Sequence, residues 1–374
     1  MKAVCLSAAT GGGHNAAAQA IARALGDLGV KTASRDCLEL AGKRVARAVE
    51  GVYVGVVRHY PSVFGKIYQA GAFVSSPRHK SPIYYANALY KDRLAAYLDE
   101  QRPDIVVCPH IFAAQTISSL RARRQLPLTA GVMTDYTCAP FWEEVDLDVF
   151  YTPSAALTEE YVAHGMKADR LVPLGIPADP VCQPCANVRA AKAAQGLAPD
   201  VRHVLLIGGS MGAGNLPEVL DELLTLPDDV HITVVCGSNA RVRAQIESAY
   251  PQGGRLRVLG RVQPLFELLD SADVVVTKPG GLTSTEVMQK RLPLVLIHPI
   301  QGVETQNAAF FEREGAACWA KKSGEAAAVV GRLLDDAGLR AAQGAAQARL
   351  ISGTAAMDIA RDLIARAADG SFHR

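Results

Sequence analysis

The chain has 374 residues, of which 49% are hydrophobic, and this length exceeds what one ordinary core supports, so we expect two domains of about 150 to 190 residues. Its 39 Lys and Arg residues nearly balance 37 Asp and Glu residues, which excludes a strongly basic nucleic-acid-binding protein and predicts no nucleic-acid partner. No uncharged apolar stretch reaches the roughly 20 residues that cross a bilayer, and the glycine-broken first residues are too short for a secretory signal, so we expect a cytoplasmic location.

The first predicted unit is a strand, a glycine-rich turn and a helix. Residues 2–7 form an apolar run, three glycines follow at 11–13, and a helix is predicted from the spacing of its apolar residues, which are Ala17, Ile21, Ala24, Leu25 and Leu28. Glycines let the backbone approach a ligand closely, and the free N–H groups of a helix N-terminus favour anions. The imidazole of His14 at this position is also a candidate base near neutral pH.

Two other interpretations of this turn stay open. The glycines are also consistent with a plain strand-to-helix turn that carries a partly exposed histidine. The stretch also fits the dinucleotide pattern G-x-G-x-x-G/A through Gly11, Gly13 and Ala16, with Asp36 placed where an NAD-dependent oxidoreductase has its ribose-binding carboxylate. A single pattern of this kind is weak, so the rest of the chain must decide.

Strand-like runs alternate with helical ones along most of the chain, which predicts parallel sheets covered by helices. In the first half the runs are residues 2–7, 30–37, 104–109, 128–135, 148–153 and 170–177. After a proline-rich linker at 175–187 they resume at 203–210, 231–237, 256–261, 274–281 and 294–299. The predicted fold class is therefore α/β, with two Rossmann-like domains that face a central cleft.

The eight cysteines have no paired metal-ligand spacing, which is typical of reduced thiols in a cytosolic enzyme. The C-x-x-C at Cys182 and Cys185 has no second pair and lies in the linker, so neither zinc binding nor redox activity is expected there.

The second domain contains two further glycine-rich turns, at 205–215 and 274–288. Each one follows a strand, so each suits phosphate binding, although a capped helix after a tight turn explains either one alone. In the second turn, Glu286 lies one helical turn beyond Thr283 and can accept two ribose hydroxyls. The polar loop at 299–307 follows the next strand and suits the hydroxyls of a sugar.

Five ordered motifs make the chain resemble glycosyltransferase family 28, in its processive diacylglycerol glucosyltransferase and monogalactosyldiacylglycerol synthase branch. They are "GGGHNAAAQAI" at 11–21, "VMTDYTCAPFW" at 132–142, "GGSMGAGN" at 208–215, "TKPGGLTSTE" at 277–286 and "PIQGVETQNAAFF" at 299–311. The resemblance implies a GT-B fold, a UDP-sugar donor, a lipid acceptor such as diacylglycerol, inversion at the anomeric carbon, and neither metal nor cofactor. It also implies an acceptor- and membrane-binding domain at 1–175, a UDP-sugar-binding domain at 176–350, and a helix at 351–374 that packs back toward the first domain.

The same motifs imply roles for individual residues. His14 is the expected base, and Asp135 is expected to orient it or share its proton. The acceptor and its loop are assigned to Gly12, Gly13, Tyr136 and Trp142. The resemblance assigns the diphosphate to Gly209, Ser210, Gly281, Leu282 and Thr283, and it places Met211, Gly212 and Gly280 at the donor without a separate role. Glu286 is assigned to ribose, the backbone around Val262 to uracil, and Glu304, Gln306 and Asn307 to the sugar or phosphates.

The chain departs from the family pattern at two positions. Relatives usually have a histidine in the segment where this chain has Ala139, and a glutamine where it has Val303. The loss of that glutamine removes an amide from the sugar side. The resemblance therefore leaves the identity of the donor sugar and the geometry of the acceptor open.

Residues 43–93 predict a membrane contact. Lys and Arg residues greatly outnumber Asp and Glu in this stretch, and aromatic and valine side chains lie between them. This pattern suits the surface of an anionic bilayer, here the inner face of the cell membrane, although a solvated basic face over buried aromatics gives the same pattern.

Three rival functions remain at this stage. The first is the peptidoglycan-type N-acetylglucosaminyl transferase of the same family, which acts on a lipid-linked sugar diphosphate and has a similar "GGSMGA" motif. The second is the NAD-dependent oxidoreductase, which leaves the two phosphate loops of the second domain unexplained. The third is a catalytically silent UDP-sugar-binding protein on a membrane.

Overall fold

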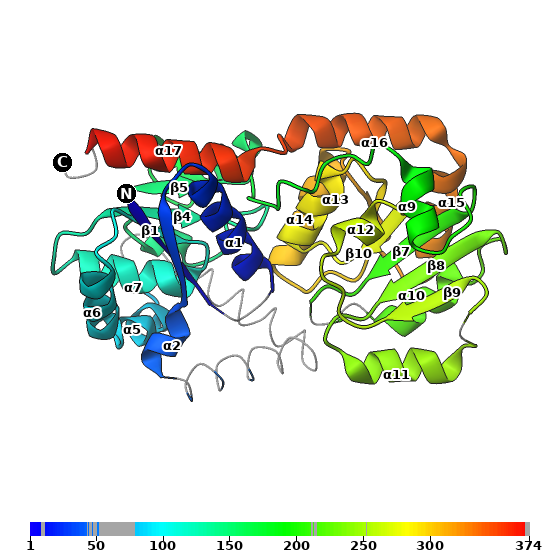
Figure 1. Ribbon diagram of the computed structural model, residues 1–374, viewed down its shortest axis with the longest axis horizontal. Helices are drawn as coiled ribbons and strands as arrows, with labels where there is room; N and C mark the ends of the chain where they lie inside the picture. The colour runs from blue at the N-terminus through cyan, green and yellow to red at the C-terminus, as the bar shows by residue number, and fades with distance from the viewer. Residues whose placement is uncertain are drawn as a thin grey trace. The chain divides into compact units, whose positions relative to one another are not determined.

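The computed structural model divides into two compact units, which we describe separately. It describes residues 1–8, 12–42, 44, 47, 51, 79–210, 212, 215–251 and 253–370. Unit 1 consists of Met1–Pro180 and Thr354–Arg374, and unit 2 consists of Val181–Gly353. The chain therefore leaves unit 1 within the linker predicted at 175–187 and returns to it shortly after the boundary predicted at 350 (Figure 1).

Unit 1 is built on a six-stranded parallel sheet with the order β2-β1-β3-β4-β5-β6. Its strands are β1 (Lys2–Ser7), β2 (Lys31–Asp36), β3 (Ile105–Cys108), β4 (Leu128–Val132), β5 (Val149–Tyr151) and β6 (Leu171–Val172). The residues of β3 and β4 are buried throughout, as expected for parallel strands that are covered on both faces. All six strands were predicted from strand-like runs, and the structure confirms them, although β2 is mostly exposed.

Helices α1 (Gly12–Asp27) and α17 (Ala355–Asp369) share one face of this sheet. Ile21 of α1 and Ile359 of α17 belong to one apolar cluster with strand residues such as Val107. Leu28, predicted on the buried face of α1, is exposed because the helix ends at Asp27. The opposite face is covered by α7 (Ile111–Arg121), against which α5 (Pro82–Ala88), α6 (Lys91–Gln101) and α2 (Cys37–Ala41) pack (Figure 1).

Unit 2 has its own six-stranded parallel sheet, with the order β12-β11-β10-β7-β8-β9. Its strands are β7 (Arg202–Ile207), β8 (Val230–Val235), β9 (Leu256–Leu259), β10 (Val274–Thr277), β11 (Leu294–Leu296) and β12 (Cys318–Trp319). The apolar runs predict the first five, and the structure confirms them. Strand β12, which consists of only two residues, was not predicted.

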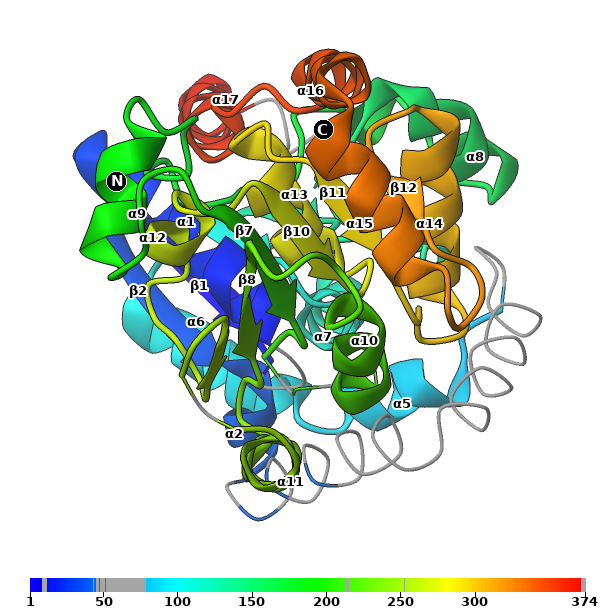
Figure 2. The same cartoon turned by 90° about the vertical axis from the view of Figure 1, so that its right-hand side faces the viewer.

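Helices α10 (Leu216–Leu223) and α15 (Ala326–Asp335) bury their apolar faces in one cluster with β7, β8 and β10 (Figure 2). The remaining helices of unit 2 are α9 (Val188–Ala194), α11 (Ala240–Ala249), α12 (Phe266–Leu269), α13 (Gly281–Gln289), α14 (Val303–Arg313) and α16 (Ala337–Leu350). Across the described ranges of both units, no helix is long and apolar enough to cross a membrane.

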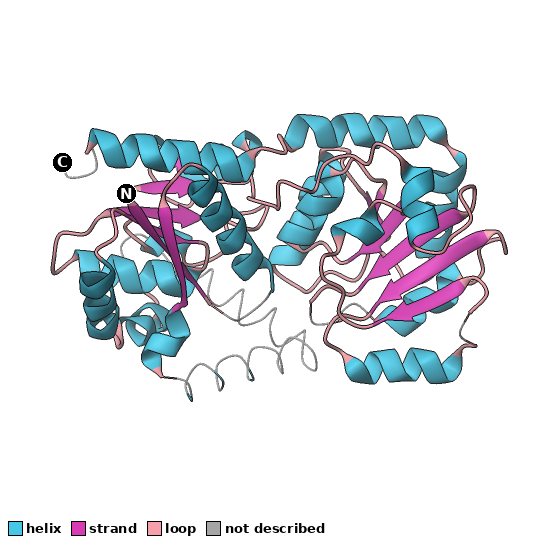
Figure 3. Cartoon of the chain, in the orientation of Figure 1, coloured by secondary structure: helices cyan, strands magenta, loops and turns pink. Residues whose placement is uncertain are grey.

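Each sheet has one point where the strand order reverses, and both are parallel sheets (Figure 3). In unit 1 the chain runs from β1 to β2 on one side and continues with β3 on the other side of β1. In unit 2 it runs from β7 through β8 and β9, and then continues with β10 on the other side of β7. Ligands of open α/β sheets bind beyond the carboxyl ends of the strands at such points, so the topology marks two places where a site is expected.

Candidate active site

His14 lies at the reversal point of unit 1, in the first turn of α1 directly after Gly12 and Gly13. Its Nδ1 atom is 2.9 Å from the carbonyl oxygen of Pro109, which follows β3. A carbonyl only accepts hydrogen bonds, so Nδ1 carries the proton and Nε2 keeps its lone pair. The hydroxyl oxygen of Thr134, 3.0 Å from the same Nδ1, lies beside this contact. The free lone pair on Nε2 is the one that a general base requires.

The surroundings of His14 favour the neutral imidazole. Burial lowers its pKa below the ordinary value, while the negative charge of Asp135 partly opposes this shift. The ring of His110 stands edge-on to it, with centroids 4.5 Å apart and planes at 79°. Burial, and then the proximity of His14, hold the pKa of His110 well below its ordinary value. His14 is therefore unprotonated on Nε2 at neutral pH.

His110 is a neighbour of the site that was not predicted from the sequence. Its Nδ1 atom accepts a hydrogen bond of 3.1 Å from the backbone N–H of Phe112 and so caps α7. Its position directly after the predicted strand at 104–109 was the available signal, because residues at the carboxyl end of a parallel strand line such sites.

The loop after β4, which carries Asp135, is fixed from α8 (Thr158–Ala163). The carboxylate of Glu160 accepts hydrogen bonds from the Thr137 hydroxyl at 2.6 Å and from the Cys138 backbone N–H at 2.7 Å. The hydroxyl of Tyr161 donates to the carbonyl oxygen of Thr137 at 3.2 Å. These hydrogen bonds hold the loop that carries Asp135, which is itself half-buried.

Tyr136 and Trp142, expected at the acceptor, belong to the interior of unit 1. Their residues are only 1% and 6% exposed. The Trp142 ring stands edge-on to Phe150 at 6.4 Å, and it lies so close to Gly131 that a Cβ atom there would be 2.9 Å from it. The apolar bulk of these side chains is used for packing, and their role at the acceptor stays a prediction.

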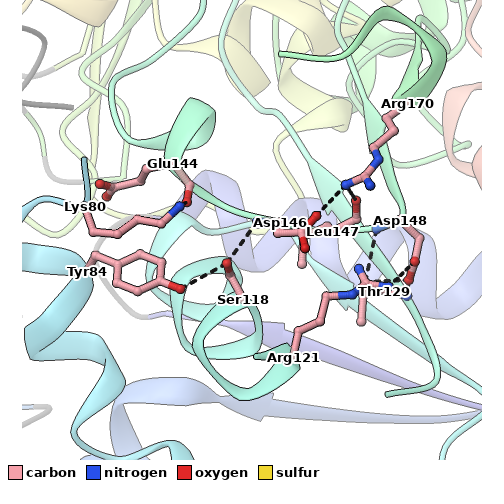
Figure 4. A network of polar contacts seen from close by, with 10 residues as sticks. All are labelled: Lys80, Tyr84, Ser118, Arg121, Thr129, Glu144, Asp146, Leu147, Asp148 and Arg170. Carbon is pink, nitrogen blue, oxygen red and sulfur yellow. Dashed lines mark hydrogen bonds and ion pairs between the residues drawn. The ribbon is translucent and has the colours of Figure 1, made fainter. Parts of the chain in front are cut away.

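Glu144 holds in place the chain just before α5, which lies within the predicted membrane stretch at 43–93 (Figure 4). This fully buried carboxylate accepts from the Ser81 backbone N–H at 2.6 Å and from the Ser81 hydroxyl at 2.7 Å. Lys80 donates to the Glu144 carbonyl oxygen, and Tyr84 and Ser118 are hydrogen-bonded at 3.1 Å. Most of the basic stretch at 43–93 lies outside the described residues.

In unit 2, the loop after β7 carries Gly209 and Gly212 with φ of 68° and 61°, a region that favours glycine. The loop after β8 holds it in place, because the Asn239 side chain donates to the Gly212 carbonyl at 3.1 Å and the Ser238 N–H donates to the Ser210 carbonyl at 2.9 Å. A Cβ atom on Gly212 would lie 2.1 Å from the Cys236 carbonyl oxygen. Ser210 is exposed, and Met211 lies outside the described residues.

The turn after β10 ends at Gly280, the N-cap of α13, which has no side chain with which to cap the helix. The N–H groups of Gly281, Leu282 and Thr283 lie in the first turn, where an α-helix offers them no internal acceptor. An anion is the natural partner for such groups.

Asn307 supports this turn from below. It is fully buried, and its side-chain amide donates to the carbonyl oxygen of Pro279 at 3.0 Å. This bond helps to shape the turn, and a contact of Asn307 with the sugar or phosphates stays a prediction. Gln306, its neighbour on α14, is exposed.

Glu304, expected at the sugar, forms an ion pair with Lys278. Its other carboxylate oxygen accepts from the backbone N–H of Ile300 at 2.9 Å. No role was predicted for Lys278, although its place between a strand and a Gly-Gly turn was a usable signal. The Lys278 side chain passes between the two glycine-rich loops, since a Cβ on Gly209 would lie 2.9 Å from its Cε and a Cβ on Gly280 would lie 3.3 Å from its Nζ.

Glu286 and Val262 were also expected to contact the donor. Glu286 is half-buried on α13, one helical turn beyond Thr283. Val262 is half-buried in the loop that follows β9. Their contacts with ribose and uracil stay predictions.

Comparisons with known proteins identify the family. Residues 14–178 match the model of monogalactosyldiacylglycerol (MGDG) synthase, and residues 203–356 match that of the glycosyltransferase family 28 C-terminal domain. A processive diacylglycerol beta-glucosyltransferase of Bacillus subtilis is 30% identical over 276 residues, which is 73% of this chain and 71% of the relative. The chain belongs to glycosyltransferase family 28. The corresponding protein of Bacillus licheniformis is 29% identical over 279 residues, with the same coverage of both chains.

Solved structures support the GT-B fold of this family 28 glycosyltransferase. MurG of Acinetobacter baumannii has a TM-score of 0.58 and 15% identity, covering 97% of this chain and 99% of that one. The glycosyltransferase SnogD of Streptomyces nogalater has a TM-score of 0.56 and 18% identity, covering 98% and 99%. At these identities the likeness concerns the fold alone.

The family membership also decides between the rival functions. The match to the MGDG synthase model and to diacylglycerol glucosyltransferases favours that branch over the peptidoglycan-type transferase. The oxidoreductase interpretation loses its support. Asp36, expected at the ribose of NAD, caps α2 by accepting a hydrogen bond of 2.8 Å from the Leu38 N–H. Gly11, the first glycine of the dinucleotide pattern, lies outside the described residues.

Proposed function

We propose that this enzyme transfers a hexose from a UDP-sugar to the hydroxyl of diacylglycerol or of a glycosyl-diacylglycerol. The observation that carries the proposal is the similarity over 276 residues to a processive diacylglycerol beta-glucosyltransferase. The first matched segment begins at His14 and includes β2 and β3, and the second includes both glycine-rich turns of unit 2.

In the proposed reaction the acceptor oxygen attacks the anomeric carbon of the sugar. The bond from that carbon to the β-phosphate oxygen breaks, and UDP leaves with the electron pair. The acceptor proton passes to Nε2 of His14, the nitrogen left free by the contact with Pro109. Asp135 stabilises the imidazolium that forms, in keeping with its effect on the pKa of His14. A single displacement of this kind inverts the configuration at the anomeric carbon.

We infer that the donor diphosphate lies at the turn after β10. The first-turn N–H groups of α13 supply hydrogen bonds there, and Gly209 lies beside the Lys278 side chain that adjoins this turn. These fixed donors stabilise the charge on the leaving group, so we propose that no metal takes part, and a chelator is expected to leave turnover unchanged.

We also propose that the protein works at the surface of an anionic membrane. Tyr85 and Leu89, within the predicted membrane stretch, are 62% and 85% exposed. Lys80 and Lys91 flank them in the sequence. Exposed apolar side chains with neighbouring cations are typical of a membrane-surface contact.

The test is to incubate the protein with UDP-glucose, UDP-galactose or UDP-N-acetylglucosamine in separate reactions, each with anionic vesicles that contain diacylglycerol. Mass spectrometry of the lipids is expected to show a glycosyl-diacylglycerol, and its mass series tells whether one or several sugars are added. Lipid-linked sugar diphosphate serves as an alternative acceptor. Transfer to that acceptor alone would contradict the proposal in favour of the peptidoglycan-type activity.

A further inference from the structure

The ion pair between Lys278 and Glu304 lies at the reversal point of unit 2. Lys278 directly follows β10, and Glu304 lies in the first turn of α14. Their side chains are only 13% and 12% exposed. Removing two charges from water is costly, and replacing such a pair with apolar groups is often neutral or stabilising, so the pair is poor evidence for a purely structural role.

The ammonium group of Lys278 lies close to the N-terminus of α13. It lies 3.3 Å from where a Cβ of Gly280 would be, and Gly280 is the uncapped N-cap of α13. The side chain also runs close to Gly209, because a Cβ there would lie 2.9 Å from its Cε atom. An anion bound to the first-turn N–H groups of α13 would therefore lie within reach of a second, fully charged donor.

Glu304 is held in a way that allows the pair to separate. One of its oxygens accepts from the backbone N–H of Ile300 at 2.9 Å, and the other one contacts Lys278. If Lys278 leaves, the first hydrogen bond still fixes the carboxylate in place. The second oxygen then becomes available to a hydroxyl.

We propose that Lys278 binds the donor diphosphate, and that donor binding exchanges its partner. The phosphate takes the ammonium from Glu304, and the released carboxylate oxygen accepts a hydroxyl of the sugar. This inference rests on the proposed function, because it assumes a UDP-sugar at this turn. It also explains why Glu304, which is expected to contact the sugar, is paired with Lys278 in the structure.

The test measures the affinities of the full chain for UDP and for uridine by titration calorimetry. Loss of a charge-assisted contact in Lys278→Gln is expected to weaken UDP binding about ten- to hundredfold and to change uridine binding less than about twofold. Lys278→Arg keeps the charge and is expected to retain part of the UDP affinity. Glu304→Gln no longer competes for the ammonium, so UDP is expected to bind several-fold more tightly.

Lys290→Gln is the matched control. Lys290 is buried in the same unit and forms an ion pair with Asp270, so its loss removes the same charge from a comparable environment. It is expected to lower the melting temperature without changing UDP affinity. Equal losses of UDP and uridine affinity in Lys278→Gln, or weaker UDP binding in Glu304→Gln, would overturn the exchange. Because the readout is nucleotide binding, failure to form a glycolipid would count against the proposed function only.

Discussion

Both units reverse the strand order of a parallel sheet at one point, but the strand orders differ and so do the side chains that lie at these two points. In unit 1 the site holds two adjacent imidazoles, His14 and His110, whose pKa values are both lowered by burial. In unit 2 it holds a cation, a carboxylate and the uncapped N-terminus of α13. The first set is suited to accepting a proton and the second to binding an anion. The fold thus fixes where a site lies, and the side chains of each unit decide what it does.

The largest expected effect comes from removing the base. His14→Ala is expected to lower turnover about a hundred- to ten-thousandfold, as is usual for loss of a general base, and to leave UDP affinity unchanged. Steady-state kinetics and calorimetry on the same preparation measure both. His110→Asn keeps an acceptor for the N–H of Phe112 and serves as the control, with a smaller loss expected. Normal turnover in His14→Ala would remove the assignment.

A third histidine with a lowered pKa, His203, tests whether this property alone marks a site. His203 in β7 is fully buried, contacts the Ser271 carbonyl and the Thr233 hydroxyl, and burial lowers its pKa to about 4. The unfolded chain binds a proton at higher pH than the folded one, so stability falls as pH drops below about 6.5 toward 4.

Between pH 7 and pH 5, His203 is expected to account for about 2 kcal/mol of lost unfolding free energy. Urea unfolding of His203→Asn is expected to show a correspondingly weaker pH dependence. If the wild type and the variant lose the same free energy over this range, the pKa of His203 is not lowered as stated. Turnover at neutral pH is expected to remain, since His203 lies within β7 and in none of the glycine-rich turns.

The glycine-rich loop after β7 can be tested by adding a side chain at Gly209. Gly209→Ala forces alanine into a left-handed conformation and against the Cε atom of Lys278, and it is expected to weaken UDP binding about tenfold. Gly196→Ala is the matched control, because Gly196 has a similar φ of 75° and a Cβ added there would meet no atom within 4 Å. Both variants are expected to lose about 1 kcal/mol of stability. Equal UDP affinity in both would argue against close approach of the diphosphate to Gly209.

The charge of Asp135 should set the acid limit of activity. This carboxylate raises the pKa of His14 against the effect of burial. Asp135→Asn is therefore expected to shift the acid limb of the pH profile of kcat to lower pH, together with a loss of turnover. A limb that stays in place or moves to higher pH would show that Asp135 does not act on His14.

The smallest expected effect concerns the membrane. Leu89→Ser is expected to reduce binding to anionic vesicles about fivefold, because it removes part of the apolar surface available for insertion. Val162→Ser changes an exposed apolar side chain on α8, outside the basic stretch, and is expected to bind as the wild type does. Co-sedimentation with vesicles measures both, and equal binding by the two variants would place the contact elsewhere.

Most strands could be predicted because buried parallel strands are continuous apolar runs, with the polar strand β2 and the unpredicted strand β12 as exceptions. The glycine-rich turns at the strand ends located both reversal points. Which polar side chains face inward could not be predicted. Asn307 and Glu304 lie on a helix that also carries exposed positions, and their partners Pro279 and Lys278 are brought to them only by the packing of α14 against the turn after β10. Trp142 is a similar case, because its burial depends on the absence of a side chain at Gly131.

The return of the chain to unit 1 has a consequence for biosynthesis. Helix α17 supplies Ile359 and Leu363 to the apolar cluster that α1 and the sheet of unit 1 share. On the ribosome these residues emerge only after the whole of Val181–Gly353 has been made. Unit 2 is thus a continuous segment that can fold first, whereas unit 1 keeps an apolar face uncovered until its last helix arrives. During that interval the nascent chain exposes a surface of the kind that chaperones bind.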